Sequence, residues 1–362
     1  MSNFQIGLAI AGGLVLAGVV AHSAWSARKN QPKLATPEAP ADELPRQPQN
    51  DGTADRQEPS FDGDLSLGSL SNFALLPSLE KKPGLDALID VIAPVAVEDT
   101  VSGEAALAAM PATRRAGSKP FGVEGLNIAT KEWELPCANQ RYSAFQCGVQ
   151  LANRVGALNQ IEYSEFVIKA QAFADAVGGE PEFPEMMDEV ARARELDQFA
   201  NAHDAQLSFT LRAVGTAWSP GYVVQKAGRI GFVAGAVPGR MVLPATQRET
   251  PTGIGHSGAP ILGLAFNTQA AMADEPEQTA LREVTLSLDV PQVSRAEQPF
   301  VRMRESAALL AASMGGMVMD DNGNRIAPEA MDVIGSELEQ LYDTLDGRDL
   351  SAGSVLARRL FS

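Results

Sequence analysis

The first residues of the chain form an uncharged stretch that constrains the rest of the molecule. Residues 4–25 contain no Asp, Glu, Lys or Arg. At ~1.5 Å per helical residue this stretch reaches ~33 Å, which is enough to cross the ~30 Å hydrocarbon layer of a bilayer. We therefore predict one membrane-spanning helix, which together with its basic flank occupies residues 1–30.

The charges around this stretch predict its direction. Arg28, Lys29 and Lys33 follow it, and no basic side chain precedes it. The positive-inside rule then places the N-terminus outside and the bulk of the chain in the cytoplasm. A cleavable signal peptide is the alternative, but it would need a basic leader and a shorter apolar core.

Small side chains recur at every fourth position of the predicted span. They are Ala9, Gly13, Ala17 and Ala21. Such a face lets two helices approach closely, so one interpretation is self-association through the anchor. The other is an ordinary span that happens to be rich in small residues.

The next segment, residues 31–84, has the composition of a disordered tether. It is rich in Pro, Gln, Asp, Glu, Ser and Gly, and so buries too little apolar surface to offset its ordering entropy. One apolar patch, residues 65–79, interrupts it. This patch is expected to dock either on the folded part of the chain or on a partner.

Composition narrows the possible partners of the folded part. The chain has 362 residues, 45% of them hydrophobic, which suffices for two or three cores. Its 45 acidic residues outnumber 29 basic ones, and the formal charge of -16 repels phosphate backbones, so we expect no nucleic-acid partner. Two cysteines, Cys137 and Cys147, are too few for a disulfide framework or a four-ligand zinc site.

Beyond residue 84 the sequence repeats weakly, with three matches in the same order. The matches pair Ala116, Gly117 and Phe121 with Ala227, Gly228 and Phe232; residues 174–179 with 311–316; and Pro184, Glu185, Met187 and Asp188 with Pro328, Glu329, Met331 and Asp332. We predict a duplicated unit. Its copies are a shortened module over 85–201 and a fuller one over 202–345. Residues 346–362 would be a C-terminal tail that either frays or touches a membrane surface.

Periodicity predicts the elements of each module. In the second, strands near 207–211, 262–266 and 284–290 alternate apolar and polar residues. A helix near 298–314 carries Val301, Ala308, Leu309 and Ala312, and a hairpin turn at Asn322 and Gly323 precedes a last helix. The first module has strands near 88–97 and 143–152, a helix near 103–116 and no such hairpin. The predicted fold is α+β: an antiparallel sheet with helices on one face only.

Catalytic and metal-binding patterns are weak. Ser257 beside His256 lacks the strand-turn-helix context of a nucleophile elbow. Residues 320–324 suit a hairpin turn better than a calcium loop, because no bidentate Glu follows at the required distance. We therefore predict no catalytic residue, metal or cofactor, and a binding protein rather than an enzyme. An unrecognised enzyme is the competing class.

Several runs in the second module resemble one known family. They are residues 225–232 (QKAGRIGF), 261–266 (ILGLAF), 284–291 (VTLSLDVP) and 311–321 followed by Pro328. With the anchor and tether, they resemble the bacterial ZipA family of cell-division proteins and its C-terminal FtsZ-binding domain. The resemblance implies a single-pass protein of the inner membrane with a periplasmic N-terminus. It also implies that the chain binds the C-terminal tail of FtsZ and tethers or stabilises the division ring, without catalysis.

In that family the ligand lies on the helix-free face of the sheet. Carried over to this sequence, the resemblance implies a partner-binding site at Ala265, Asn267, Thr285 and Ser287. Side-chain parity along 284–290 agrees, because it puts Leu286 and Leu288 under the helices and Ser287 on the other face. The alternative is a membrane-anchored adaptor of the same fold for a different cytoplasmic partner.

Overall fold

The structure is a computed structural model that describes residues 32–35, 84–245, 248–250, 253–255, 260–273, 275 and 279–362. The predicted membrane span and the apolar patch at 65–79 lie outside these residues. Among the residues that are described, no helix is both long and apolar enough to cross a membrane. The described chain is α+β, with antiparallel sheets and packed helices, as the sequence predicts.

The first sheet has the strand order β2-β3-β5-β1-β8, with β4 added beside β3. Its core lies between the sheet and helix α3, where Val91, Phe145, Phe166 and Phe173 are fully buried. Helix α3 begins at a capping box in which Asn159 and Glu162 satisfy each other's backbone N–H groups. The elements are β1 (Asp90–Ser102), α2 (Gly103–Ala109), β2 (Arg115–Ala116), β3 (Lys119–Asn127), β4 (Trp133–Glu134), β5 (Arg141–Gln150), β6 (Ala152–Asn153), β7 (Gly156–Ala157), α3 (Gln160–Val177) and β8 (Gly179–Pro181).

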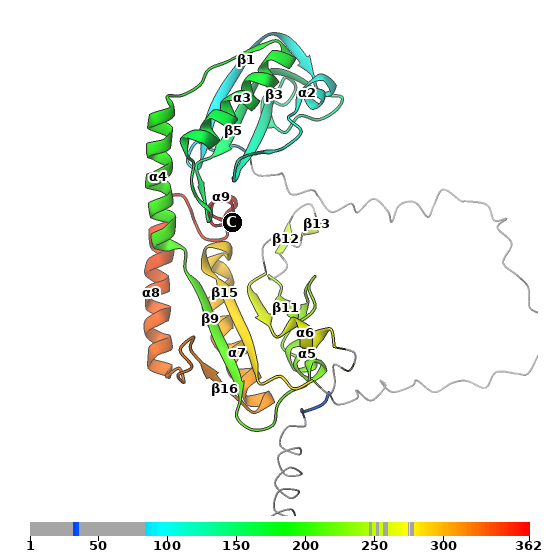
Figure 1. Ribbon diagram of the computed structural model, residues 1–362, viewed down its shortest axis with the longest axis vertical. Helices are drawn as coiled ribbons and strands as arrows, with labels where there is room; N and C mark the ends of the chain where they lie inside the picture. Colours follow the sequence, from blue (N-terminus) through cyan, green and yellow to red (C-terminus); the bar gives the residue numbers. More distant parts are fainter. Residues whose placement is uncertain are drawn as a thin grey trace, which may run out of the picture.

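The second sheet has the order β10-β11-β14-β15-β9-β16, and helix α7 packs against β9, β15 and β16. Helix α4 (Met186–His203) joins the two sheets, and Figure 1 shows α4 and α8 one above the other along the same side of the molecule. The elements are β9 (Gln206–Ala213), α5 (Pro220–Gly228), β10 (Val233–Ala234), β11 (Arg240–Leu243), β12 (Arg248–Thr250), β13 (Gly253–Gly255), β14 (Leu262–Ala265), α6 (Thr268–Ala271), β15 (Glu283–Asp289), α7 (Pro299–Met314), β16 (Gly316–Met319), α8 (Pro328–Asp346) and α9 (Val355–Leu360).

The two sheets share an order of elements. In each, the first strand lies between a central strand and a short last strand: β1 between β5 and β8, and β9 between β15 and β16. The long helix before the last strand ends in a left-handed glycine, Gly178 at φ 69° and Gly315 at φ 69°. One predicted match is wrong. Ala116 lies in a strand, whereas Ala227 lies in the last turn of α5, and the helix predicted to reach residue 116 ends at Ala109.

The apolar face predicted for α7 is also wrong. Val301 and Leu309 are 48% and 55% exposed. The face that packs on the sheet is instead Phe300, Met303, Ala307, Leu310 and Met314. Apolar residues occur all round this helix, so the periodicity of its sequence does not distinguish the buried face from the exposed one.

The C-terminal tail is folded, which corrects the prediction of a frayed end. Leu360 and Phe361 are each 1% exposed and belong to the core of the second module. The Arg359 guanidinium pairs with Asp90 of the first module at 2.5 Å, and the Gln150 amide donates to the Arg359 carbonyl at 2.8 Å. Figure 1 shows α9 at the level where the two modules meet.

Residues 32–35 contact the second module, which differs from the prediction that they belong to a disordered tether. They lie within the range 31–84, yet Lys33 forms a parallel bridge with Trp218 of the second module. Four residues of the predicted tether are therefore part of the folded body.

Candidate partner-binding face

The helix-covered face of the second sheet is apolar. Phe209, Leu211 and Leu264 are at most 2% exposed, and Leu286 and Leu288 are 0% and 1% exposed, as side-chain parity predicts. The alternate residues of the same strands therefore point to the opposite, helix-free face.

Strand register arranges these alternate residues in rows across the sheet. Thr210 pairs with Thr285, and Thr285 pairs with Ala265, so these three side chains share one row. The next row holds Ser208 and Ser287 with Gly263. Residues paired directly across antiparallel strands lie on the same face, so the rows form a continuous surface.

Three of the four predicted site residues lie on this face. Ala265 and Thr285 are partly buried neighbours, and Ser287 is exposed. Asn267 lies beyond the end of β14, where its Oδ1 caps helix α6 by accepting from the Gln269 N–H at 2.8 Å. The structure thus places Asn267 in a helix cap outside the strand rows.

Sequence reasoning missed the contribution of the neighbouring strands. Ser208, Thr210 and Arg212 come from β9, and Met317 and Met319 come from β16, which pairs with β9. The alternation of β9 was visible in the sequence. Its position between β15 and β16 was not, because strand order is a property of the folded chain.

The strand rows of this face carry mostly uncharged side chains. A Cβ at Gly263 would lie 2.8 Å from the Ser287 Oγ, so glycine leaves space beside the serine. At its edge Arg212 pairs with Glu283 at 2.6 Å, and both side chains are about half exposed. Hydroxyl groups and small side chains of this kind suit contact with a partner surface, and the Ser208 hydroxyl donates to the Asp321 carboxylate.

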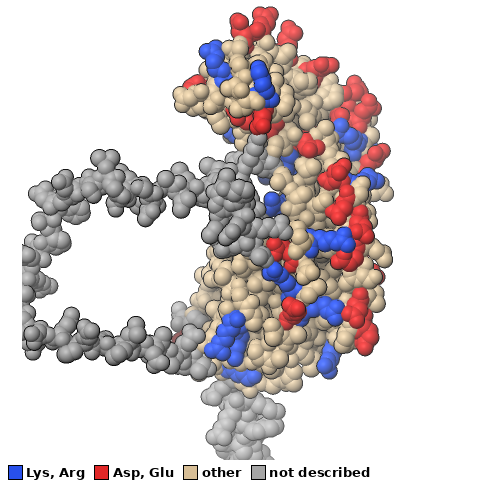
Figure 2. Space-filling model, turned by 180° about the vertical axis from the view of Figure 1, so that it is seen from behind, with Lys and Arg blue, Asp and Glu red and all other residues tan. Residues whose placement is uncertain are grey.

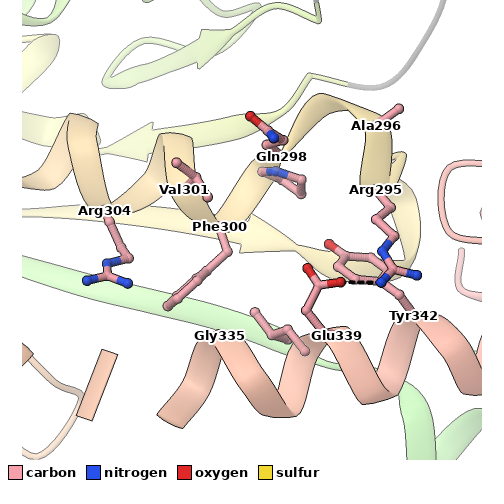
Figure 3. Close-up of a pocket in the computed structure, with 11 residues that line it drawn as sticks. Arg295, Ala296, Gln298, Phe300, Val301, Arg304, Gly335, Glu339 and Tyr342 are labelled. Atoms are coloured by element: carbon pink, nitrogen blue, oxygen red, sulfur yellow. Dashed lines mark hydrogen bonds and ion pairs between the residues drawn. The ribbon is translucent and has the colours of Figure 1, made fainter. Parts of the chain in front are cut away.

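A second concave region lies between α7 and α8. It is a pocket of about 510 Å³ in which the Arg295 guanidinium pairs with Glu339 (Figure 3). Tyr342 is 3% exposed, and its hydroxyl has no hydrogen-bond partner among the described residues; burial raises its pKa. The pocket is lined by Arg295, Ala296, Gln298, Pro299, Phe300, Val301, Arg304, Gly335, Leu338, Glu339 and Tyr342.

Charged side chains concentrate elsewhere on the molecule. Figure 2 shows acidic and basic groups gathered along the side that α4 and α8 form. No group of three or more His, Cys, Asp or Glu in the described part of the chain could hold a metal ion. Cys147 is buried, which raises the pKa of its thiol to about 12, while Cys137 is exposed.

The fold and this face define a class of module, an antiparallel sheet with helices on one face and an open opposite face. Residues 266–337 match the family model of the ZipA C-terminal FtsZ-binding domain. The predicted family resemblance is confirmed over this range, which runs from the end of β14 into α8. By its description the family is one of binding domains. A search of curated proteins found no match.

Proposed function

We propose that this chain is a membrane-anchored cell-division protein that binds FtsZ through its second module and tethers or stabilises the division ring at the inner membrane. The observation that carries this proposal is the match of residues 266–337 to an FtsZ-binding domain. The matched range includes β15, α7 and β16, which together build part of the open face and its helical support.

The binding site in this proposal is the helix-free face of the second sheet. Ala265, Thr285 and Ser287 form its centre. On the β16 side Met317 adds partly exposed apolar surface, and Met319 is buried beside it. The C-terminal tail of FtsZ would lie across these rows. Asn267 would stabilise the end of the strand through its cap to α6.

The anchor in this proposal is the uncharged stretch at residues 4–25, with a periplasmic N-terminus and a cytoplasmic body. A periplasm-dependent reporter fused after Ser362 should therefore be silent. The small residues spaced by four would allow two anchors to associate.

We also infer that the two modules arose by duplication. Their shared order of elements and their left-handed glycines at Gly178 and Gly315 support this inference. The first module would then be either a second binding surface or a support for the second. Five domain ranges follow: 1–30, 31–84, 85–201, 202–345 and 346–362, of which residues 32–35 and the last range pack on the folded modules.

The direct test is a titration of the full-length protein, held in lipid nanodiscs, with a peptide of the FtsZ C-terminal tail. Saturable binding supports the proposal, and a scrambled peptide of the same composition is the control. No binding by a protein with a normal melting transition would favour the alternative, an adaptor of the same fold for another cytoplasmic partner. The hydroxyl-rich rows at Ser208, Thr210, Thr285 and Ser287 are the feature that favours this alternative.

A further inference from the structure

The short segment 32–35 docks on the second module through its backbone. The Lys33 N–H donates to the Ala217 carbonyl at 2.6 Å, and the Ser219 N–H donates to the Lys33 carbonyl at 2.9 Å. These bonds make a parallel bridge beside Trp218, which is fully buried. The segment therefore extends a backbone edge of the module, as an added strand does.

The Lys33 side chain makes a second, independent contact. Its Nζ donates to the Met314 carbonyl at 2.6 Å, at the carboxyl end of α7, and Trp218 Nε1 donates to the same carbonyl at 2.9 Å. A cation is favoured there because the carboxyl end of a helix carries partial negative charge. A Cβ at Gly315 would lie 2.9 Å from the Lys33 Nζ, so the glycine after α7 also leaves room for the ammonium group.

The chain docks again where its described part resumes at residue 84. Leu85 packs on the face of the first sheet that lies opposite α3, where a Cβ at Gly148 would lie 2.5 Å from its Cδ2. The Leu85 N–H donates to Glu124 Oε1 at 3.0 Å, and the Gln146 amide donates to Glu124 Oε2 at 2.7 Å. The described residues on both sides of 36–83 therefore lie on the folded body.

We propose that residues 32–35 are a docking segment that holds the second module next to the membrane anchor. Residues 32–35, rather than residue 84, then set the distance of the second module from the bilayer. The membrane part of this proposal rests on the proposed anchor at residues 4–25; the docking itself does not.

Docking of residues 32–35 shortens the maximum distance between the second module and the membrane anchor. From Trp25 to Pro32 a fully extended chain covers at most ~25 Å, whereas from Trp25 to Gly84 it would cover up to ~210 Å. Docking therefore keeps the candidate partner-binding face close to the bilayer surface. A partner would therefore bind at the bilayer surface and not at the end of a long tether that reaches into the cytoplasm.

Hydrogen exchange of the full-length protein in lipid nanodiscs tests the docking. We expect the Lys33 amide to exchange roughly tenfold or more slowly than in an unstructured chain, because it is bonded to Ala217. In Lys33→Glu a carboxylate would face the negative end of α7, and the protection should be lost. Lys29→Glu is the matched control, since it makes the same charge change outside the docking segment. An unprotected Lys33 amide in the wild type, or equal loss in both variants, would overturn the proposal.

A distance measurement tests the consequence at the membrane. Val214 is 66% exposed, so Val214→Cys in a Cys137→Ser background provides a surface site for a donor dye, with acceptor dye in the lipid. We expect efficient energy transfer that falls in Lys33→Glu and is kept in Lys29→Glu. Transfer that is the same in all three proteins would contradict the proposal. A protein that fails to float with liposomes but keeps the Lys33 protection would refute the anchor and leave the docking intact.

Discussion

At the scale of single residues, the open face of the second sheet depends on side chains that add little to stability. Ser287 is exposed, and Ala265 is only partly buried. The residues that alternate with them, such as Leu286, are in the core. Binding and folding can therefore be separated by substitutions one position apart.

Ser287→Arg and Ala265→Arg should each weaken binding of the FtsZ tail at least about thirtyfold while leaving the melting temperature nearly unchanged. A bulky charge in the centre of a small interface costs ~2 kcal/mol or more, about a thirtyfold loss of affinity. Titration of each variant with the tail peptide measures the loss. Val333→Arg, at a residue of α8 that is 58% exposed, is the control and should bind normally. Full binding by both test variants would show that the site lies elsewhere.

Leu286→Asp should unfold the second module. Leu286 is 0% exposed, and a carboxylate there would be buried without a partner, which costs at least ~4 kcal/mol. Circular dichroism and thermal melting measure the change, with the neighbouring Ser287→Asp as the control on the open face. A cooperative transition at the wild-type temperature would show that the register of β15 is not the one described.

At the scale of elements, α9 joins the two modules through a buried ion pair. Asp90 is fully buried, and its Arg359 partner is 18% exposed. Burial raises the pKa of Asp90 above its ordinary value of 3.8, and the Arg359 charge and hydrogen bond oppose part of this rise. Removing the arginine should therefore raise the pKa of Asp90 further.

Arg359→Met should destabilise the protein by about 3 kcal/mol at neutral pH and by less in acid. A carboxyl whose pKa is raised on folding binds its proton more tightly in the folded state. The stabilisation that comes from this tighter proton binding is thus fully present below the pKa of the carboxyl in the unfolded protein. It is lost as the pH rises through the pKa of the carboxyl in the folded protein. Chemical denaturation between pH 4 and neutral pH measures the difference. Arg358→Met removes the adjacent arginine and is the control; a pH-independent loss in Arg359→Met would contradict this account.

At the scale of the whole molecule, the two sheets are linked by more than helix α4. Arg154 of the first module pairs with Asp204 at 2.6 Å and with Asp289 of β15 at 2.8 Å. Ile89 and Ala152, from the first module, belong to the core cluster of the second. The contacts of α9 add to this interface, so the modules should move as one body.

Truncation after Ser354 should loosen this arrangement. It removes Leu360 and Phe361, whose burial contributes ~1.5–3 kcal/mol each, together with the Arg359 pair. We expect a larger radius of gyration in small-angle scattering and a lower melting temperature. Deleting Ser362 alone is the control. An unchanged radius of gyration would mean that α4 and the Arg154 pairs suffice to hold the modules together.

Local patterns in the sequence determined much of the second module. The alternation at 284–290, the glycine that closes α7 and the proline that starts α8 each depend on neighbours a few residues away, and all appear as predicted. The family resemblance rested on the same local runs. Such features can be read from sequence because backbone geometry and side-chain parity act over short distances.

Tertiary structure alone decided which apolar face of α7 is buried, where β9 lies in the sheet and that the C-terminal residues fold back onto both modules. It also decided that Lys33 docks on Met314, a contact between residues that are 281 positions apart. No local pattern carries this information. The free energy of such contacts depends on which distant surfaces meet. Arg359 finds Asp90 only when both modules are formed, and Lys33 finds its partners only when the second module is formed.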